Sequence, residues 1–338
     1  MALPFKDYEL LDCGNGRKLE RFGEFILDRP SPVALGEKIT NRALWKSADV
    51  RFVEFPREMS KWSKKAPSSS GQQSRGEWIP CSDKGSTFFE MGEASSSEEN
   101  GNKNSISCRP WLLPFSDSLV LELKGSPFGH IGVFPEQAEN WSRIRQLCLK
   151  GKEALGRPLR ILNLFGYTGG SALAALSSGA EATHLDAART VVAQARRNWQ
   201  ISMKLLNIKS EEACARWIVD DAVKFVKREI KRGSVYDGVI LDPPTYGHGA
   251  RGEVWRFSRD IEPFLLLCLK LLKSDFRFVL LSGHTPRYEY PVLKKILQSS
   301  ILDTYGRSTK IQCIAKALEI KASTGKKLPA GDMALAIF

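Results

Sequence analysis

From Arg157 onward the sequence repeats one pattern, in which a short apolar run is followed by a turn and then by a longer segment of helical composition. The candidate strands are 159–164, 182–185, 215–219, 238–241 and 276–281, and the candidate helices are 171–178, 190–206, 222–232 and 261–272. Because strands that alternate with helices pair in parallel and are covered on both faces, the pattern predicts an α/β fold with a Rossmann-like, doubly wound sheet. Segments 316–321 and 333–338 predict a closing antiparallel β-hairpin.

The part of the chain before this pattern has a different composition. Its apolar groups are short and separated by glycine and proline, and further along it contains polar, serine-rich runs. Trp78 and the pair Phe88-Phe89 interrupt those runs and are candidate islands of order. Four segments are therefore expected: a smaller β-rich region at 1–59, a flexible insertion at 60–107, a strand and a helix at 108–150, and the α/β domain at 151–338.

Charge and residue spacing limit the classes of partner. The net charge of +12 favours polyanions, so RNA or another nucleic acid is a predicted partner, although a basic surface also occurs on proteins that bind none. The seven cysteines are widely spaced without a C-x-x-C pair, and the four histidines lack metal-ligand spacing, so we expect no metal site and a reducing compartment. The absence of a long apolar run or a secretory signal predicts a cytoplasmic protein without a membrane span, with an organelle as the alternative.

A glycine-rich turn follows the first strand of the repeated pattern, at 163–170. Glycines let the backbone approach a ligand closely, and the next helix presents free N–H groups, although such a turn can also be purely structural. Asp186 ends the second strand, where a carboxylate can accept hydrogen bonds from two ribose hydroxyls or cap the next helix. Asp220 and Asp221 end the third strand, where Asp221 is a candidate for the adenine amino group or, equally, a helix cap.

The fourth strand ends in Asp242-Pro243-Pro244-Thr245-Tyr246. Two prolines fix the backbone and remove two N–H donors, so we expect the carbonyl groups to face a ligand and Tyr246 to stack on a flipped base. A rigid structural turn is the alternative interpretation. The segment 246–257 interleaves arginines and aromatic residues with glycines and predicts a mobile lid that meets phosphate and base, with a solvated loop as the alternative. His248 and His284 are candidate bases or donors that could also be merely exposed.

Three motifs in the sequence resemble those of one known group. Residues 157–338 are similar to the class I S-adenosylmethionine-dependent methyltransferases, and specifically to the bacterial 23S ribosomal RNA large-subunit methyltransferases. The group's N-x-F-x-Y-T-G-G, D-P-P-[KT]-[FY] and upstream G-x-[FY]-x-x-Q motifs are matched by residues 163–170, 242–246 and 132–137. A closing antiparallel hairpin is also more typical of these proteins than of dehydrogenases.

The resemblance implies the cofactor and the site residues. The cofactor would be S-adenosylmethionine, held by Asn163, Phe165, Gly166, Tyr167, Thr168, Gly169, Asp186, Asp220, Asp221 and Asp242. The side that faces the target base, with the catalytic set, would comprise Asp242, Pro243, Pro244 and Tyr246.

Methylation at C5 of a pyrimidine needs a cysteine thiolate, which members of the group carry after the fifth strand. This chain has Ser282-Gly283-His284 there, so we expect attack by a base nitrogen without a covalent intermediate, as in the guanine-N7 branch that the D-P-P-T-[FY] form resembles. The leading hypothesis is a methyltransferase that methylates a base nitrogen of RNA, such as ribosomal RNA during its processing. The alternatives are a protein or small-molecule methyltransferase, a non-catalytic RNA-binding or assembly module and, more distantly, a dehydrogenase.

Overall fold

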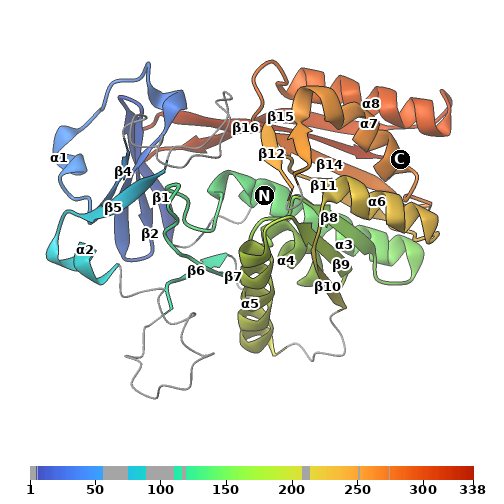
Figure 1. Ribbon diagram of the computed structural model, residues 1–338, viewed down its shortest axis with the longest axis horizontal. Coiled ribbons are helices and arrows are strands. Elements are labelled where there is room, and N and C mark those ends of the chain that lie inside the picture. Colours follow the sequence, from blue (N-terminus) through green and yellow to red (C-terminus); the bar gives the residue numbers. More distant parts are fainter. Residues whose placement is uncertain are drawn as a thin grey trace. The chain divides into compact units, whose positions relative to one another are not determined.

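The computed structural model describes residues 5, 7–55, 75–88, 110–115, 119–207, 214–249, 252–273 and 275–338. These residues divide into two compact units, whose elements are labelled in Figure 1. The C-terminal unit consists mainly of Glu136–Glu319 and Ala330–Phe338, and the N-terminal unit of Pro4–Pro135 and Ile320–Pro329. The predicted domain boundary at 150/151 therefore lies inside the C-terminal unit, which already begins at Glu136.

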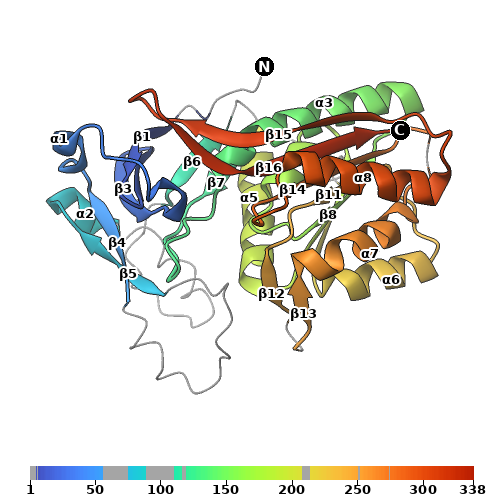
Figure 2. The same ribbon diagram turned by 90° about the horizontal axis from the view of Figure 1, so that it is seen from above.

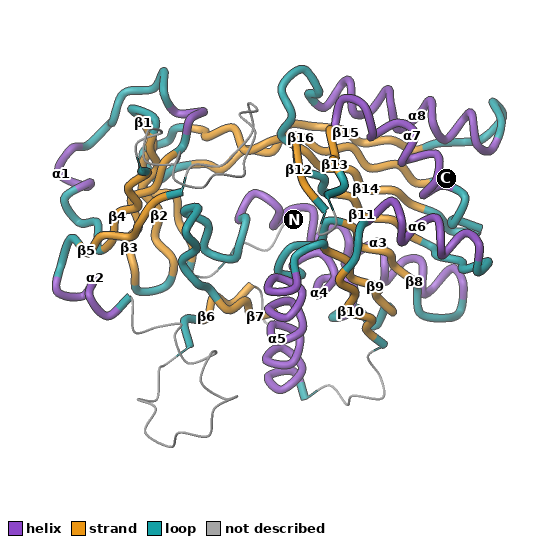
Figure 3. Tube along the Cα trace, viewed as in Figure 1, coloured by secondary structure: helices purple, strands orange, loops and turns teal. Residues whose placement is uncertain are grey.

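The C-terminal unit is built on a seven-stranded sheet with the order β10-β9-β8-β11-β14-β16-β15. Its strands are β8 (Arg160–Leu164), β9 (Glu181–Asp186), β10 (Ala215–Val219), β11 (Gly238–Leu241), β14 (Phe278–Gly283), β15 (Gln312–Lys321) and β16 (Lys327–Ile337). Strands β8 to β11 and β14 pair in parallel, whereas β16 runs antiparallel to β14. The predicted doubly wound sheet with an antiparallel C-terminal hairpin is confirmed, and Figure 3 shows its strands next to one another.

Helices cover both faces of this sheet, and Figure 2 shows α3 on one side and α6, α7 and α8 on the other. They are α3 (Ala138–Leu155), α4 (Gly170–Leu176), α5 (Arg189–Leu206), α6 (Ala222–Lys231), α7 (Phe257–Leu269) and α8 (Tyr290–Tyr305). Every residue of β11 and β14 is buried, as expected for central strands with both faces covered. A buried apolar cluster joins these strands to α6, α7 and α8.

Two elements of this unit differ from the sequence prediction. Helix α7 begins at Phe257, earlier than the predicted 261, because Phe257 is buried and its ring packs against Tyr288. Helix α8 was not predicted at all, although Pro291 in its first turn is a typical helix-start residue. Helix α8 packs against α7, and this contact stabilises both helices. Local composition cannot predict a contact between two separate helices.

The N-terminal unit contains a five-stranded sheet with the order β1-β2-β3-β4-β5. Its elements are β1 (Tyr8–Gly14), β2 (Arg17–Phe22), β3 (Phe25–Pro30), α1 (Arg42–Trp45), β4 (Val50–Glu54), β5 (Gly76–Pro80) and α2 (Asp83–Thr87), followed by a ribbon of β6 (Leu112–Phe115) and β7 (Leu119–Glu122). Only the pair β3–β4 is parallel within the sheet, and α1 lies in the crossover between these two strands.

Part of the predicted insertion at 60–107 belongs to this sheet, which corrects its assignment as a segment unable to support a core. Strand β5 pairs antiparallel with β4, and the ring of Trp78 packs against Phe52 and Phe88. Trp78 and Phe88 of the predicted islands of order are thus confirmed, because half-buried Trp78 and buried Phe88 pack against each other beside the sheet, whereas Phe89 lies outside the described residues. Residues 60–74 and 89–107, including both serine-rich runs, lie outside the described residues.

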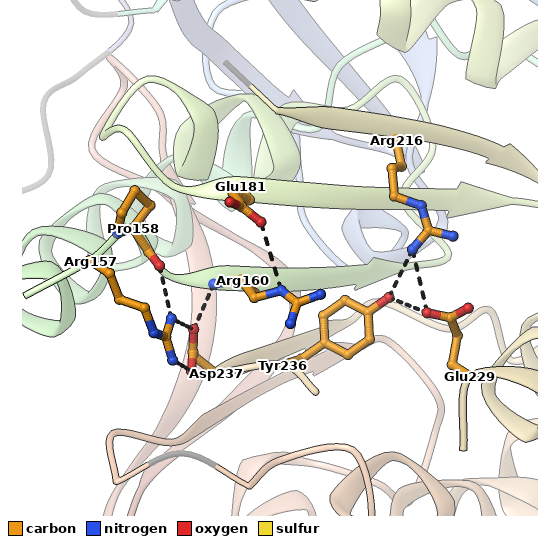
Figure 4. A network of polar contacts seen from close by, with 8 residues as sticks. All are labelled: Arg157, Pro158, Arg160, Glu181, Arg216, Glu229, Tyr236 and Asp237. Carbon is orange, nitrogen blue, oxygen red and sulfur yellow. Dashed lines mark hydrogen bonds and ion pairs between the residues drawn. The ribbon is translucent and has the colours of Figure 1, made fainter. Parts of the chain in front are cut away.

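Ion pairs and hydrogen bonds tie together the amino ends of the strands in the C-terminal unit (Figure 4). Buried Asp237, just before β11, accepts two hydrogen bonds from Arg157 at 2.8 and 2.9 Å and one from the backbone N–H of Arg160 at 2.7 Å. Buried Glu229 accepts the Tyr236 hydroxyl at 2.7 Å. The Asp237 contacts hold the starts of β8 and β11 together, and the Glu229 contact ties α6 to the segment before β11. The carboxyl ends of the strands lie at the opposite edge of the sheet.

Candidate functional site

The loop after β8 has an unusual backbone. Phe165 and Tyr167 adopt left-handed conformations, with φ of 56° and 50°, and Gly169 has a φ of 95°. Such conformations are costly for residues with a Cβ and persist only when their surroundings hold them. Asp186 at the end of β9 supplies one such constraint, because its Oδ2 accepts the Tyr167 N–H at 3.0 Å. The predicted cofactor loop and the predicted ribose acid are therefore in direct contact.

Asp186 does not cap helix α5, since the capping position belongs to Ala188. Its second oxygen, Oδ1, instead accepts the Ala188 N–H at 3.0 Å. Burial raises the pKa of Asp186, and hydrogen bonds from the backbone of Ala188 and Tyr167 counteract this increase. The half-buried carboxylate is thus fixed in one orientation at the carboxyl edge of the sheet.

Gly166 lies above two buried polar residues. A Cβ at this position would be 2.4 Å from His184 Cε1 and 2.7 Å from Asn163 Nδ2, so only glycine fits. Asn163 Nδ2 and His184 Nδ1 are 3.3 Å apart, and among the described residues His184 Nε2 has no hydrogen-bond partner. Burial lowers the pKa of His184 to about 4, so the ring is neutral at pH 7. Sequence reasoning identified Asn163 but gave His184 no role here, because no local pattern connects the two strands.

The start of helix α4 packs closely against α3 and α5. The carbonyl of buried Thr168 accepts Asn198 Nδ2 at 2.9 Å. A Cβ at Gly169 would be 2.9 Å from Ala195 Cβ, and one at Gly170 would be 2.2 Å from Trp141. Thr168 and Gly169 therefore have well-defined positions in the loop.

Asp220 and Asp221 are both engaged within the turn after β10. Asp221 caps α6, accepting the Lys224 N–H at 2.8 Å, so the capping alternative is realised for this residue. Asp220 forms an ion pair with Arg228 and accepts the Asp221 N–H at 2.8 Å. Both carboxylates lie at the same edge of the sheet as Asp186, and their contact with a cofactor stays a prediction.

The motif that begins at Asp242 follows β11 at the same edge. Half-buried Asp242 accepts a hydrogen bond from Gln137 Nε2 at 3.3 Å, and Gln137 Oε1 in turn accepts Asn140 Nδ2 at 2.7 Å. Burial raises the pKa of Asp242, whereas a hydrogen bond from Ser282 and the charge of His284 act in the opposite direction. The upstream segment 132–137 thus reaches the candidate site through Gln137, a contact between residues 105 positions apart.

One expectation for this motif is wrong in part. The Pro244 carbonyl does not face a ligand, because it accepts a hydrogen bond from the Trp255 indole N–H at 2.8 Å. Trp255 belongs to β13 (Val254–Arg256), which pairs with β12 (Tyr246–His248), so the predicted lid segment forms a short antiparallel ribbon. Residues 250 and 251 and the side chain of His248 lie outside the described part of the chain. Tyr246 begins β12, with the Arg256 guanidinium 6.0 Å from its ring centre.

In the described part of the chain, no cluster of histidine, cysteine and carboxylate side chains could hold a metal ion. Cys268 is buried within α7, and burial raises the pKa of its thiol. Within the same described ranges, no helix has the length and apolarity needed to cross a bilayer.

Known proteins share parts of this chain. The sequence model of the family "Conserved hypothetical protein 95" matches residues 141–254. "Ribosomal RNA large subunit methyltransferase K/L" of Shewanella sp. (strain MR-4) is 32% identical over 136 residues, which are 39% of this chain and 18% of that protein. "Ribosomal RNA large subunit methyltransferase I" of Aeromonas salmonicida is 28% identical over 153 residues, or 45% of this chain and 36% of that protein.

The chain therefore matches well under half the length of these two curated relatives. A solved structure resembles it along nearly its whole length. The "SAM Dependent Methyltransferase from Agrobacterium tumefaciens" has a TM-score of 0.73 and 26% identity, and the match covers 99% of this chain and 90% of that one.

Proposed function

We propose that this chain, which resembles class I S-adenosylmethionine-dependent methyltransferases and curated ribosomal RNA large-subunit methyltransferases, transfers the methyl group of S-adenosylmethionine to a nitrogen of an RNA base. One observation carries the cofactor half of this proposal. The Asp186 carboxylate and the left-handed loop 165–169 are held together by the hydrogen bond from Tyr167 N–H, at the carboxyl edge of a parallel sheet. Ligands of open α/β sheets bind at that edge, where the strand order changes direction.

In the proposed site, the cofactor's sulfonium supplies an already activated methyl group. Asp186 would accept the ribose hydroxyls, and the loop 163–169 would surround the amino-acid end, with Asp220 and Asp221 on the adenine side. Asp242, Pro243, Pro244 and Tyr246 would orient the base, with Gln137 fixing the Asp242 carboxylate. Catalysis would then rest mainly on proximity and alignment of the attacking nitrogen.

A nitrogen target is favoured by the cysteines of the described C-terminal unit. Cys148 and Cys268 are buried in helices, and Cys313 is half-buried near the start of β15, with burial raising the pKa of all three thiols. Cys214 lies just before β10, at the amino edge of the sheet. None of these thiols is placed to add to a pyrimidine bound beside Asp242.

The cofactor assignment can be tested by calorimetric titration with S-adenosylhomocysteine. Asp186→Ala should weaken binding by at least tenfold. The variant removes a carboxylate that two backbone N–H groups orient and that is proposed to accept the ribose hydroxyls. Asp303→Ala, which removes an exposed carboxylate from α8, is the matched control and should bind like the wild type. Equal affinity of the wild type and Asp186→Ala would refute the assignment.

The substrate class requires a second assay. Transfer of a labelled methyl group should enter total RNA rather than total protein when both are offered. Label in protein alone would favour a protein methyltransferase. Cofactor binding without any transfer would favour a non-catalytic RNA-binding or assembly module.

A further inference from the structure

A groove with a volume of about 780 Å³ lies beside the candidate site in the C-terminal unit. It begins at Thr245 and Thr285 and continues between α7 and α8, where Glu262 and Lys295 line it. Its volume lies within the range of roughly 300–1,000 Å³ that is usual for small-ligand sites. None of the roles assigned above to S-adenosylmethionine or to the methylated base uses this groove.

The groove is continuous with the Asp242–Tyr246 motif. Strands β11 and β14 are parallel neighbours, so their carboxyl ends lie next to each other. The Thr245 and Thr285 hydroxyls, one beyond each strand end, are 3.0 Å apart. An RNA strand that enters the groove at these threonines would therefore come from the part of the site where the target base is proposed to bind.

A strained turn brings a positive charge to the mouth of the groove. The Tyr288 N–H donates to the Thr285 carbonyl at 3.1 Å, which closes a β-turn over Pro286 and Arg287. Arg287 has a φ of 71° and occupies the turn position that normally requires glycine when proline precedes it. A side chain kept at such a position against a backbone cost is a reason to look for a function.

The polar groups of the groove suit one nucleotide. The exposed side chains of Arg287 and Lys295 have no ion-pair partner among the described residues, although many other basic residues are paired. The half-buried Tyr288 ring packs against Phe257, with ring centres 5.0 Å apart, and its hydroxyl donates to the Ser258 carbonyl at 3.4 Å. The ring is therefore held on the groove wall, where a base could stack on it.

We propose that this groove binds the RNA nucleotide adjacent to the methylated one. Its phosphate would lie at Arg287 and Lys295, its base would stack on Tyr288, and Glu262 would accept an N–H of the base edge. The inference rests on the proposed function, because it assumes an RNA substrate. It also extends that function, since a groove for the neighbouring nucleotide would make the enzyme sensitive to the sequence flanking its target.

Single variants distinguish this groove from the general basic surface. An unmodified transcript of large-subunit ribosomal RNA serves as the probe, and both its dissociation constant and the methylation kinetics are measured. Arg287→Ala and Lys295→Ala should each weaken RNA binding about fivefold and raise KM while leaving kcat nearly unchanged. Each should also lower the slope of log affinity against log salt by about 0.7, as expected for one lost phosphate contact with a single strand. Affinity for S-adenosylhomocysteine should not change.

Two further variants serve as controls. Lys294→Ala removes the neighbouring exposed lysine of α8, which does not line the groove, and should bind RNA like the wild type. Arg287→Gly should raise the midpoint of thermal unfolding, because glycine relieves the left-handed strain, yet weaken RNA binding as much as Arg287→Ala. This opposite change in stability and affinity is not expected if Arg287 only supports the fold.

The outcomes separate the groove from the proposed function. If the wild type methylates RNA but Lys295→Ala and Lys294→Ala are indistinguishable, the groove inference is wrong and the proposed function stands. If the wild type binds S-adenosylhomocysteine but neither binds nor methylates RNA, both fail together.

Discussion

At the scale of single residues, the candidate site depends on buried polar side chains whose positions are fixed by close contacts. His184 lies under the cofactor loop next to Asn163, where a Cβ on Gly166 would collide with it. Burial lowers the pKa of His184 to about 4 from an ordinary value of 6.5. The unfolded chain therefore binds a proton at this residue at pH values where the folded chain does not, and stability is lost as the pH falls from about 6.5 towards about 4.

His184→Gln tests this linkage. Between pH 7.5 and 5.0 the wild type should lose about 2 kcal/mol more of its free energy of unfolding than the variant does, because only the wild type must keep a buried imidazole neutral. Urea denaturation at both pH values measures the difference. Equal losses in the wild type and His184→Gln would contradict the assigned cause.

Gln137 provides a second test at this scale. Its amide donates to Asp242, and a donor to a carboxylate favours the charged form. Gln137→Ala should therefore lower kcat/KM for RNA methylation about tenfold and shift the acidic limb of the pH–rate profile to higher pH. A variant that loses activity without moving that limb would indicate a purely structural role for Gln137.

At the scale of elements, one buried carboxylate of the N-terminal unit contacts the tip of the β15–β16 hairpin, beside hydrogen bonds from the tip to backbone carbonyls of Leu10, Cys13 and Lys38. Asp12 in β1 accepts hydrogen bonds from Trp45 Nε1 at 3.0 Å and from the Thr40 N–H at 3.0 Å, and from Thr324 and Lys326 of the hairpin at 3.2 and 3.3 Å. Burial by itself would raise the pKa of Asp12, but the hydrogen bonds from Trp45 and from backbone N–H groups, chiefly those of Thr40, Asn41 and Cys13, outweigh it and lower the pKa to about 2.

Asp12→Asn should destabilise this unit in a pH-dependent way. The folded pKa lies below the ordinary value of 3.8, so the carboxylate's contribution is present above about pH 4 and lost as the pH falls towards 2. We expect a loss of about 2 kcal/mol at pH 7, which fades at pH 2 to 3. Urea denaturation at both pH values measures this difference. A variant as stable as the wild type at pH 7 would show that the hairpin tip does not depend on Asp12.

At the scale of the whole molecule, the net charge of +12 gives an expectation about substrate capture. If the substrate is RNA, KM for methylation should rise steeply between 50 and 200 mM salt, by at least tenfold for several phosphate contacts. Affinity for S-adenosylhomocysteine, measured in the same buffers, should change little. A KM that is insensitive to salt would favour a small-molecule or protein substrate.

Local sequence patterns are enough to predict the alternation of strands and helices, and with it the residues at the strand ends. Asn163–Gly169, Asp186, Asp221 and Asp242 lie at or just beyond the carboxyl ends of parallel strands, and these ends share one edge of the sheet. Periodicity and turn residues are local signals, so these positions could be predicted without knowing any distant contact.

Tertiary packing determines which of those residues are in contact and which residues from distant segments contact them. Gln137 donates to Asp242 across 105 positions, and the Thr285 and Thr245 hydroxyls are hydrogen-bonded. The Trp255 indole N–H donates to the Pro244 carbonyl, which the motif predicted to face a ligand. These contacts depend on how α3, β14 and the β12–β13 ribbon pack against β11. Packing depends on the shape and burial of segments that are far apart in the chain. The residues next to each motif therefore do not predict these contacts.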